Sequence, residues 1–369
     1  LCFEIIRGRT VTTAWTRAHA AAIAPESCPS VPKIGNAPRP VGSEDRYYWD
    51  MWPVQNRDGS IARLGPREMW MALSAPDRGD PEARHFEADI RWLVREQKGW
   101  VDRGAVLPRF SVPYEREWAG SALFDEGRLT LFFTGAGIVG RSGGYQQRLF
   151  EASAPVSDDG AIGEWSAPRP SIETLTPEYC AADEHHGEPG RIKAFRDPAF
   201  FRDPMDGAEY LVFTASLAAT GSDYNGAVGL ARRDGSGWSL LPPLVHADGV
   251  NNELERAHVV FRNGMYYLFW VTQTSTFAPD ANAGPTGLYG MASHSLSGPW
   301  APLNGSGLVL ANPADDPRRA YSWFVSAEGI AASFVDDPGA HGFVGAPAPL
   351  LQLAFDSETV SLAGEVQAR

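Results

Sequence analysis

The chain has 369 residues, with 43% hydrophobic and 21% charged residues, which suits one large β or α/β domain and argues against disorder. The net charge of −13 and the pI of about 5.1 oppose binding to nucleic acid or anionic lipid and fit a neutral substrate. No run of 18 apolar residues is present, so no membrane-spanning helix is predicted.

The three cysteines, Cys2, Cys28 and Cys180, lie in no CxxC pattern and in no Cys/His cluster, which argues against a zinc site. A disulfide between Cys28 and Cys180 and unpaired thiols both stay open at this point. The first residues, LCFEIIR, contain no Met and no signal-peptide pattern. Either a leader has been removed or these residues form an irregular tail, and we expect residues 1–11 to be a tail.

The first predicted element is a short helix over residues 12–23, which is rich in alanine and can be capped by Thr12 or Thr13. The Pro-rich stretch 25–40 ends it. Short runs of β-forming residues bounded by Gly, Pro and Asp then predict strands at 69–73, 129–134 and 210–214. The clearest hairpin covers residues 259–269, because Asn263-Gly264 supplies the positive φ angles of a type I′ turn.

A recurring unit follows the chain, consisting of an acidic motif, a strand, a turn and an aromatic strand. The turns at 125–127 and 206–207 resemble each other and precede similar strands. The 38 Gly, 29 Pro, 12 Trp and 18 Phe also favour many turns and short strands. This organisation predicts an all-β fold in which each blade of a β-propeller presents its innermost strand to a central channel. No linker is visible, so residues 12–369 are predicted to form a single domain.

The first acidic motif, YWDMWP at residues 48–53, places Asp50 between Trp49 and Trp52. Sugar rings stack their apolar faces on aromatic side chains while their hydroxyls seek acceptors. The plain alternative, a turn or capping Asp, does not explain the two flanking indoles. The second motif, FRDP, places Asp197 after Arg196, and the adjacent strands favour a site over an ordinary Asp-Pro turn.

The third motif, NELERA, contains Glu253 and Glu255, which share a face if the segment is a regular strand. Two acids on one face repel each other, so one of them has a raised pKa, as a general acid needs. Arg256 is expected on the opposite face if the strand is regular. The alternative is a solvated strand edge, which the following AHVV does not resemble. Retaining glycosidases need a nucleophilic carboxylate and an acid/base carboxylate, and Asp50, Asp197 and Glu255 are the candidates.

These motifs resemble glycoside hydrolase family 68, which contains levansucrases, inulosucrases and bacterial β-fructofuranosidases. The similar segments occur in the family's order over about residues 12 to 350. They are TAWTR (13–17), WDMWPVQN (49–56), EWAGSA (117–122), FRDP (195–198), ELERA (253–257), PLNGSGLVL (302–310) and AYS (320–322).

The resemblance implies a five-bladed β-propeller with a funnel-shaped central pocket. It implies that Asp50 attacks the fructosyl anomeric carbon of sucrose, that Glu255 is the acid/base, and that Asp197 stabilises the transition state. Other positions follow the same motifs. The resemblance assigns the fructosyl subsite to Trp49, Trp118 and Arg196, and the glucosyl side to Glu253, Arg256, Gln273 and Tyr321.

The expected activity is a retaining β-fructosyltransferase or β-fructofuranosidase that releases fructose to a sugar acceptor or to water. Short oligosaccharides or hydrolysis are expected at least as much as long levan. The expected partners are sucrose and sugar acceptors, with no nucleic acid and no membrane, and the expected state is a monomer or weak homo-oligomer. No cofactor is predicted. The resemblance implies an extracellular or periplasmic, secreted protein.

The chain departs from the family pattern at three places. Ala119 stands where a Ser usually hydrogen-bonds the nucleophile, a charge-assisted bond worth roughly 1.5–3 kcal/mol. Gln273 stands where levansucrases usually carry Arg or His, which leaves donor and acceptor preference open. Arg191 and Asn252 stand where Gram-positive members have calcium-binding aspartates, so we predict no structural metal and a closer likeness to the Gram-negative branch.

Other readings stay open. A related propeller glycosidase acting on a different fructoside or furanoside is one alternative, and a sugar-binding propeller without catalysis is another. His185 and His186 are expected in a polar surface loop. Ser121 lacks a G-x-S-x-G frame, which argues against a serine hydrolase.

Overall fold

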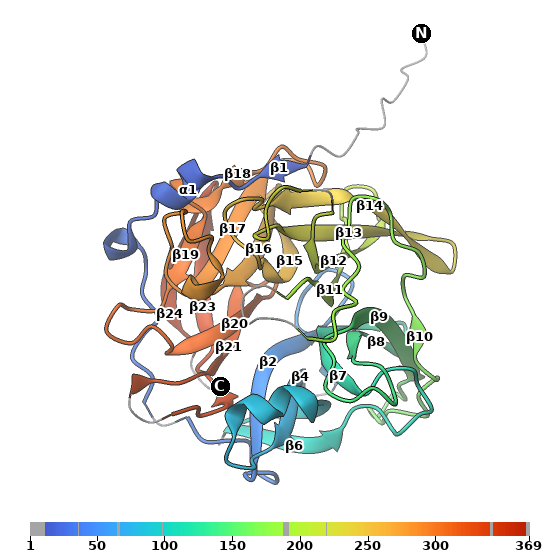
Figure 1. Ribbon diagram of the computed structural model, residues 1–369. Coiled ribbons are helices and arrows are strands. Elements are labelled where there is room, and N and C mark those ends of the chain that lie inside the picture. Colours follow the sequence, from blue (N-terminus) through green and yellow to red (C-terminus); the bar gives the residue numbers. More distant parts are fainter. Residues whose placement is uncertain are drawn as a thin grey trace.

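The structure is a computed structural model, and it describes residues 12–35, 37–64, 67–97, 99–186, 192–218, 220–339 and 342–366. Residues 1–11, predicted to be a tail, lie outside these ranges. Within the described residues, the strands form five antiparallel units arranged around a common centre (Figure 1). The chain is a five-bladed β-propeller, as its sequence predicts.

Each blade takes consecutive strands. The first blade contains β2 (Arg46–Gln55), β4 (Arg67–Pro76), β5 (Asp89–Glu96) and β6 (Gly99–Ala105), with β3 (Arg63–Leu64) paired to β4. The second contains β7 (Arg116–Asp125), β8 (Arg128–Ala136), β9 (Gln147–Pro155) and β10 (Arg169–Pro170). The third contains β11 (Phe195–Arg202), β12 (Glu209–Ser216), β13 (Gly226–Asp234) and β14 (Gly237–His246), to which β1 (Thr13–Ala14) adds in parallel.

The remaining blades follow the same order. The fourth contains β15 (Glu255–Arg262), β16 (Met265–Thr272) and β17 (Gly287–Ser293), with β18 (Ala301–Pro302) and β19 (Leu308–Ala311) both paired to β17. The fifth contains β20 (Ala320–Val325), β21 (Ile330–Val335), β23 (Leu351–Asp356) and β24 (Thr359–Glu365), with β22 (Ala346–Pro347) paired to β21. The helical elements are short: α1 (Arg17–Ala21), η1 (Pro25–Ser27), η2 (Pro81–Phe86), η3 (Thr274–Thr276) and η4 (Leu303–Gly305).

The N-terminal segment differs in detail from its prediction. The helix covers only Arg17–Ala21 and its N-cap is Thr16, not Thr12 or Thr13, because Thr13 belongs to β1. Trp15 is buried, and its Nε1 donates to the carbonyl of Ser306 in the fourth blade (2.8 Å). Because β1 pairs with β14 of the third blade, this segment fastens two neighbouring blades together at the edge of the ring (Figure 1).

The first strand of every blade is the innermost one, and these five strands surround the centre (Figure 1). They are β2, β7, β11, β15 and β20. Each contacts the inner strand of the next blade, and β20 contacts β2, so the ring closes. Between the first two blades the contact becomes a short parallel pairing of Val54 with Ala122 and of Gln55 with Leu123. Closure of the ring covers the edges of the inner strands, which protects them from pairing with other chains.

Each inner strand is interrupted by a β-bulge. The pairing register shifts between Trp49 and Trp52 in β2, and the other four inner strands show the matching shift. Those shifts lie at Trp118/Gly120, Arg196/Ala199, Glu255/His258 and Tyr321/Phe324. A bulge leaves a residue unpaired and re-aims its side chain, so the same distortion recurs around the centre of the ring.

Several local predictions are confirmed. The three predicted strands lie inside β4, β8 and β12, and residues 259–269 form the β15–β16 hairpin. Asn263 (φ 52°) and Gly264 (φ 79°) both adopt the positive φ that a type I′ turn requires. Cys28 and Cys180 are free thiols, so the disulfide alternative is wrong for this pair.

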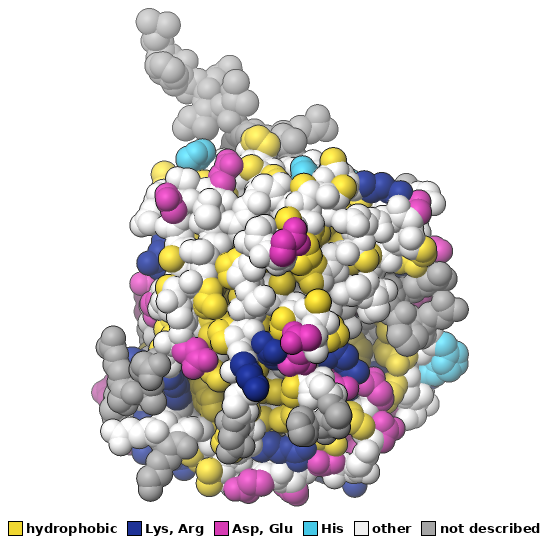
Figure 2. Space-filling model, turned by 90° about the vertical axis from the view of Figure 1, so that its left-hand side faces the viewer, with side chains coloured by type: hydrophobic (Ala, Val, Ile, Leu, Met, Phe, Trp, Pro, Cys, Tyr) yellow, Lys and Arg dark blue, Asp and Glu magenta, His cyan; other side chains and the backbone are white. Residues whose placement is uncertain are grey.

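The surface carries charged side chains of both signs. On the face drawn in Figure 2, Lys and Arg side chains lie interspersed with Asp and Glu side chains, and hydrophobic side chains lie between them. Among the residues described on this face, no broad basic patch is visible (Figure 2). No helix in the described parts of the chain is long and apolar enough to cross a membrane.

Candidate active site

A cavity of about 350 Å³ opens at the centre of the ring and takes side chains from all five inner strands. It brings together every residue that the sequence marked as a site residue. These are Trp49, Asp50, Trp118, Arg196, Asp197, Glu253, Glu255, Arg256, Gln273 and Tyr321.

The five bulges explain how so many polar groups reach one cavity. In a regular strand, neighbouring side chains point to opposite faces, yet pairs of consecutive residues such as Trp49 and Asp50 line the cavity together. Asp50, Asp197, Arg256 and Ser322 each have a φ between 47° and 59°. This left-handed conformation is costly for non-glycine residues, and such strain clusters at functional sites.

One prediction is therefore wrong. A regular strand would place Arg256 on the opposite face from Glu253 and Glu255, but the strand is bulged and the bulge turns Arg256 into the same cavity. Glu253 also precedes β15 instead of lying on a regular strand, since β15 begins at Glu255. The two acids share the cavity because of the loop and the bulge, and not because of strand alternation.

Asp50 lies in the cavity and is closely surrounded by protein atoms. This burial raises the pKa of Asp50, while the nearby Arg256 guanidinium and the Ser322 hydroxyl oppose the rise. Ser322 Oγ is buried and forms no hydrogen bond of ordinary geometry with any described residue. Its hydroxyl nevertheless lies near enough to favour the charged form of Asp50. The result is a carboxylate with little competing hydrogen bonding, which suits a nucleophile.

Asp197 is held more tightly. Thr214 Oγ1 donates to Asp197 Oδ2 (3.0 Å), and the backbone N–H of Asp197 donates to Thr134 Oγ1 (2.8 Å). Arg196 Nε lies 3.4 Å from Asp197 Oδ2. Burial raises the pKa of Asp197 to about 6, although Arg196 and Arg256 both act to lower it. Asp197 is a fixed acceptor that faces the same space as Asp50.

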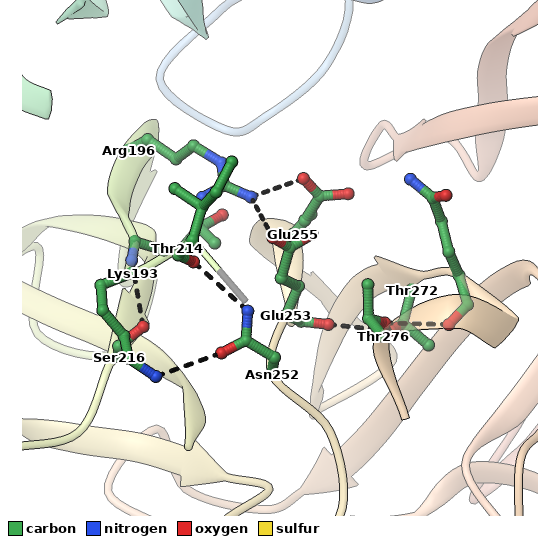
Figure 3. A network of polar contacts seen from close by, with 12 residues as sticks. Lys193, Arg196, Thr214, Ser216, Asn252, Glu253, Glu255, Thr272 and Thr276 are labelled. Atoms are coloured by element: carbon green, nitrogen blue, oxygen red, sulfur yellow. Dashed lines mark hydrogen bonds and ion pairs between the residues drawn. The ribbon is translucent and has the colours of Figure 1, made fainter. Parts of the chain in front are cut away.

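Glu255 lies between a cation and a phenol. Arg196 Nη2 donates to Glu255 Oε1 (2.5 Å; Figure 3). The Tyr321 hydroxyl donates to Glu255 Oε2. The same Nη2 lies 3.5 Å from Glu253 Oε1. Burial and the neighbouring Glu255 raise the pKa of Glu253, so a proton is retained on this pair of acids. Burial alone would lower the pKa of Arg196, but the surrounding carboxylates raise it.

Arg256 supplies a second buried cation. Its Nη2 donates to the carbonyl of Met51 (3.1 Å), and its guanidinium carbon lies 5.2 Å from the ring centre of Trp52. Its backbone N–H donates to Thr214 Oγ1 (2.9 Å). Since Thr214 also donates to Asp197, one hydroxyl links the bulges of β11 and β15.

Aromatic side chains wall the cavity. Trp118 Nε1 donates to the carbonyl of His85 (3.0 Å), and Trp49 lies edge-on to the His85 ring at 6.1 Å. Burial lowers the pKa of His85 to about 3, so its imidazole is neutral at pH 7. Arg84 lies 5.7 Å from the Trp49 ring centre. Apolar walls with fixed polar groups are the usual design of a sugar pocket.

The structure places three of the residues at which the chain departs from the family pattern. Ala119 lies at the bulge of β7 and is fully buried, and its side chain has no hydroxyl to offer to Asp50. Gln273 is the N-cap of η3 and its side chain lies beside the Tyr321 hydroxyl. Asn252 is buried, whereas Arg191 lies outside the described residues. Ser121 Oγ accepts from the N–H of Phe200 (2.9 Å), which is a structural role.

The cavity also contains residues that the sequence did not single out. They are Leu73, Glu82, Arg84, His85, Tyr145, Gln147, Ile192, Ser275, Thr276, Arg318, Ser322, Phe334 and Asp336. Asp80 caps η2 and Pro81 begins it, which predicts a helical turn but not that the turn reaches the pocket. The sequence could have indicated Ser322 as a cavity residue. It follows the site residue Tyr321 in the same way that Asp50 follows Trp49 and Asp197 follows Arg196.

The fold and the cavity together define a five-bladed β-propeller enzyme with three separate carboxylate motifs at its centre. The sequence profile of the levansucrase/invertase family matches residues 6–231 and 220–364. The levansucrase of Erwinia amylovora is 32% identical in sequence over 376 aligned residues. The alignment covers 88% of this chain and 86% of that levansucrase. The extracellular sucrase of Zymomonas mobilis is also 32% identical, over 361 aligned residues that cover 88% of this chain and 85% of that sucrase.

A solved structure agrees. The inulosucrase from Halalkalicoccus jeotgali, determined with kestose bound, has 36% sequence identity and a TM-score of 0.87, covering 97% of each chain. The chain therefore belongs to the levansucrase/invertase family, glycoside hydrolase family 68, and is an enzyme of that family.

Proposed function

We propose that this enzyme is a retaining β-fructosyltransferase and β-fructofuranosidase that acts on sucrose through a covalent fructosyl-enzyme. The observation that carries the proposal is the convergence of Asp50, Asp197 and Glu255 in one aromatic-walled cavity of a levansucrase/invertase-family chain. Levansucrases and an inulosucrase among its relatives support fructosyl transfer as the reaction class. A sugar-binding propeller without catalysis would need no such set of acids.

In the first step Asp50 attacks the anomeric carbon of the fructosyl unit, and the bond to the glucosyl oxygen breaks. Glu255 gives its proton to that oxygen, so glucose leaves as a neutral alcohol and Glu255 becomes a carboxylate. Asp50 is suited to attack because burial and the absence of strong hydrogen bonds keep its carboxylate reactive. The Tyr321 hydroxyl and Arg196 hold the two oxygens of Glu255 in place.

In the second step Glu255, now a carboxylate, takes a proton from the acceptor hydroxyl or from water. The oxygen of the acceptor attacks the fructosyl anomeric carbon and Asp50 leaves, which restores both carboxyl groups. The two displacements on the same carbon retain its configuration. Transfer and hydrolysis share these residues, so their ratio depends on how an acceptor competes with water in the open part of the cavity.

We assign the fructosyl subsite to Trp49, Trp118 and Arg196, with Asp197 binding fructosyl hydroxyls as positive charge develops on the ring. Its fixed position between Thr214 and Arg196 supports this role, since preorganised groups stabilise a transition state without reorganising. The glucosyl side is assigned to four further residues of the cavity. These are Glu253, Arg256, Gln273 and Tyr321.

We also propose the domain organisation, the substrates, the location and the oligomeric state of the enzyme. We infer one catalytic domain over residues 12–369, because the five blades share one ring and one cavity. The substrates are sucrose and sugar acceptors, and neither a cofactor nor a metal takes part in the steps above. The relative from Zymomonas mobilis is named an extracellular sucrase, and we propose an extracellular or periplasmic location for this enzyme too. A monomer or weak homo-oligomer is proposed.

The test is a time course of free glucose and free fructose after sucrose is added, with the products sized by chromatography. Release of glucose in excess of fructose shows transfer, and equal release shows hydrolysis. Asp50→Asn is the matched variant, since it keeps the shape of the side chain and removes the nucleophile. Full sucrose turnover by Asp50→Asn would overturn the assignment. Turnover of another fructoside but not of sucrose would show that sucrose is not the donor and that the other fructoside is.

A further inference from the structure

A half-buried lysine lies close to the segment that carries the acid/base pair. Lys193 precedes β11 and lies three residues before Arg196. Its Nζ donates to the carbonyl of Asp223 (2.7 Å) and to Asn225 Oδ1 (2.7 Å), and it lies 3.5 Å from Asn252 Oδ1 (Figure 3). Three neutral oxygens from two other segments thus converge on one ammonium group.

These contacts join three separate parts of the chain. Asp223 and Asn225 belong to the connection between β12 and β13, and Asn252 belongs to the connection between β14 and β15. Asn252 Nδ2 donates back to the carbonyl of Ile192 (3.3 Å), next to Lys193. Asn225 and Asn252 are both buried, so the ammonium is the group that satisfies their side-chain oxygens. A single positive charge therefore fastens the two connections to the segment that enters β11.

One of these connections carries the acid/base machinery. Asn252 directly precedes Glu253, and β15 begins two residues later at Glu255. On the side away from Lys193, Thr272 Oγ1 donates to the carbonyl of Glu253 (2.8 Å; Figure 3). The N–H of Asn252 donates to the carbonyl of Thr276 (3.0 Å). The connection is thus clamped between η3 on one side and Lys193 on the other.

The distance that this clamp fixes matters for the chemistry. Arg196 reaches across from β11 to both Glu253 and Glu255. Lys193 lies on the same segment as Arg196, and Asn252 lies on the same segment as the two acids. The ammonium group of Lys193 therefore sets how closely the guanidinium group of Arg196 approaches Glu253 and Glu255. A shift of that connection would move Glu255 away from Arg196 and Tyr321 together.

We propose that Lys193 is a positioning residue for Glu255, acting as a cation built into the chain that holds the Asn252–Glu255 segment against β11. The inference rests on the proposed function, in which Glu255 protonates the departing glucose. Lys193 touches no reacting atom in this scheme. Its removal impairs proton delivery more than it impairs attack by Asp50, which lies on a different blade.

The test compares Lys193→Met, which keeps the length of the side chain and removes the charge, with Lys33→Met as the matched control at an exposed lysine. Two donors are used, sucrose and 4-nitrophenyl β-D-fructofuranoside. Nitrophenolate leaves without a proton, whereas glucose needs one. We expect Lys193→Met to lower kcat on sucrose by at least about tenfold and to lower kcat on the nitrophenyl donor much less, in line with the 10²–10⁴-fold worth of general acid catalysis. Lys33→Met should behave as wild type.

Chemical rescue gives a second readout that a merely structural lysine would not show. Lys193→Ala leaves room for a small amine, so added ethylammonium should restore sucrose turnover, while tetramethylammonium at the same concentration should not, because it has no N–H to donate. Asn225→Ala removes one acceptor and should give the same donor selectivity in a smaller degree. This milder variant keeps the test decisive if Lys193→Met fails to fold.

Equal loss on both donors, or no loss on either, would overturn the role of Lys193. Failure of this inference and failure of the proposed function are separable with Glu255→Gln. If Glu255→Gln loses sucrose turnover while Lys193→Met keeps it, only the positioning role fails. If Glu255→Gln keeps full turnover, the proposed function fails first.

Discussion

Ser322 offers a direct probe of how Asp50 is kept ionised. It lies at the bulge of β20 with a φ of 59°, and its hydroxyl is the neutral group that lowers the pKa of Asp50. Ala119, at the corresponding bulge of β7, has no hydroxyl to share this task. The perturbation is Ser322→Ala, which removes one oxygen and leaves the backbone conformation to the surrounding strands.

The expected size follows from the hydrogen bond. A bond to a charged group contributes about 1.5–3 kcal/mol, and the lower end applies because Ser322 Oγ forms no hydrogen bond of ordinary geometry with any described residue. Since 1.36 kcal/mol corresponds to one pKa unit, losing about 1.5 kcal/mol raises the pKa of Asp50 by about one unit. The carboxylate is the nucleophile, so activity disappears as the pH falls through this pKa. Ser322→Ala therefore moves the acid limb of kcat/KM upward by about one pH unit.

The assay is glucose release from sucrose at limiting concentration, measured across the acid and neutral range. Ser333→Ala is the matched control, because Ser333 is equally buried, lies in the same blade and also has an unpaired Oγ, but does not line the cavity. Adding Ala119→Ser to Ser322→Ala should move the limb back by supplying a hydroxyl from β7. If the limb of Ser322→Ala coincides with that of Ser333→Ala, the hydroxyl does not act on Asp50 and the reasoning is refuted.

Three further predictions follow from the same geometry. Glu255→Gln should lower sucrose turnover by about 10²–10⁴-fold with a smaller loss on a nitrophenyl fructoside, and equal losses on the two donors would contradict its role as the acid. The pKa of Asp197 is raised to about 6, so its contribution to stability is complete below about pH 4 and is lost as the pH rises through 6. Denaturant unfolding should show the wild type losing up to about 3 kcal/mol more than Asp197→Asn between pH 4 and pH 7, and parallel pH curves would contradict this. Because Cys28 and Cys180 are free, dithiothreitol should leave the melting temperature unchanged, and a fall would indicate a disulfide.

Much of the fold was visible in the sequence because its signals are local. Asn263-Gly264 accepts positive φ angles and therefore dictates the β15–β16 hairpin without help from distant residues. Gly- and Asp-bounded aromatic runs predicted strands at the right places for the same reason. The carboxylates were recognisable because each stands beside an aromatic or cationic neighbour within its own short motif, as Asp50 does beside Trp49.

The tertiary structure decided which way the side chains point. Nothing local requires a left-handed backbone at Asp50, Arg256 or Ser322, and strand alternation placed Arg256 on the wrong face. Each of the five inner strands has a bulge, and the bulges turn consecutive residues into the cavity. The clamp made by Lys193 likewise joins segments that are close only after closure, so its role depends on contacts that no sequence spacing contains.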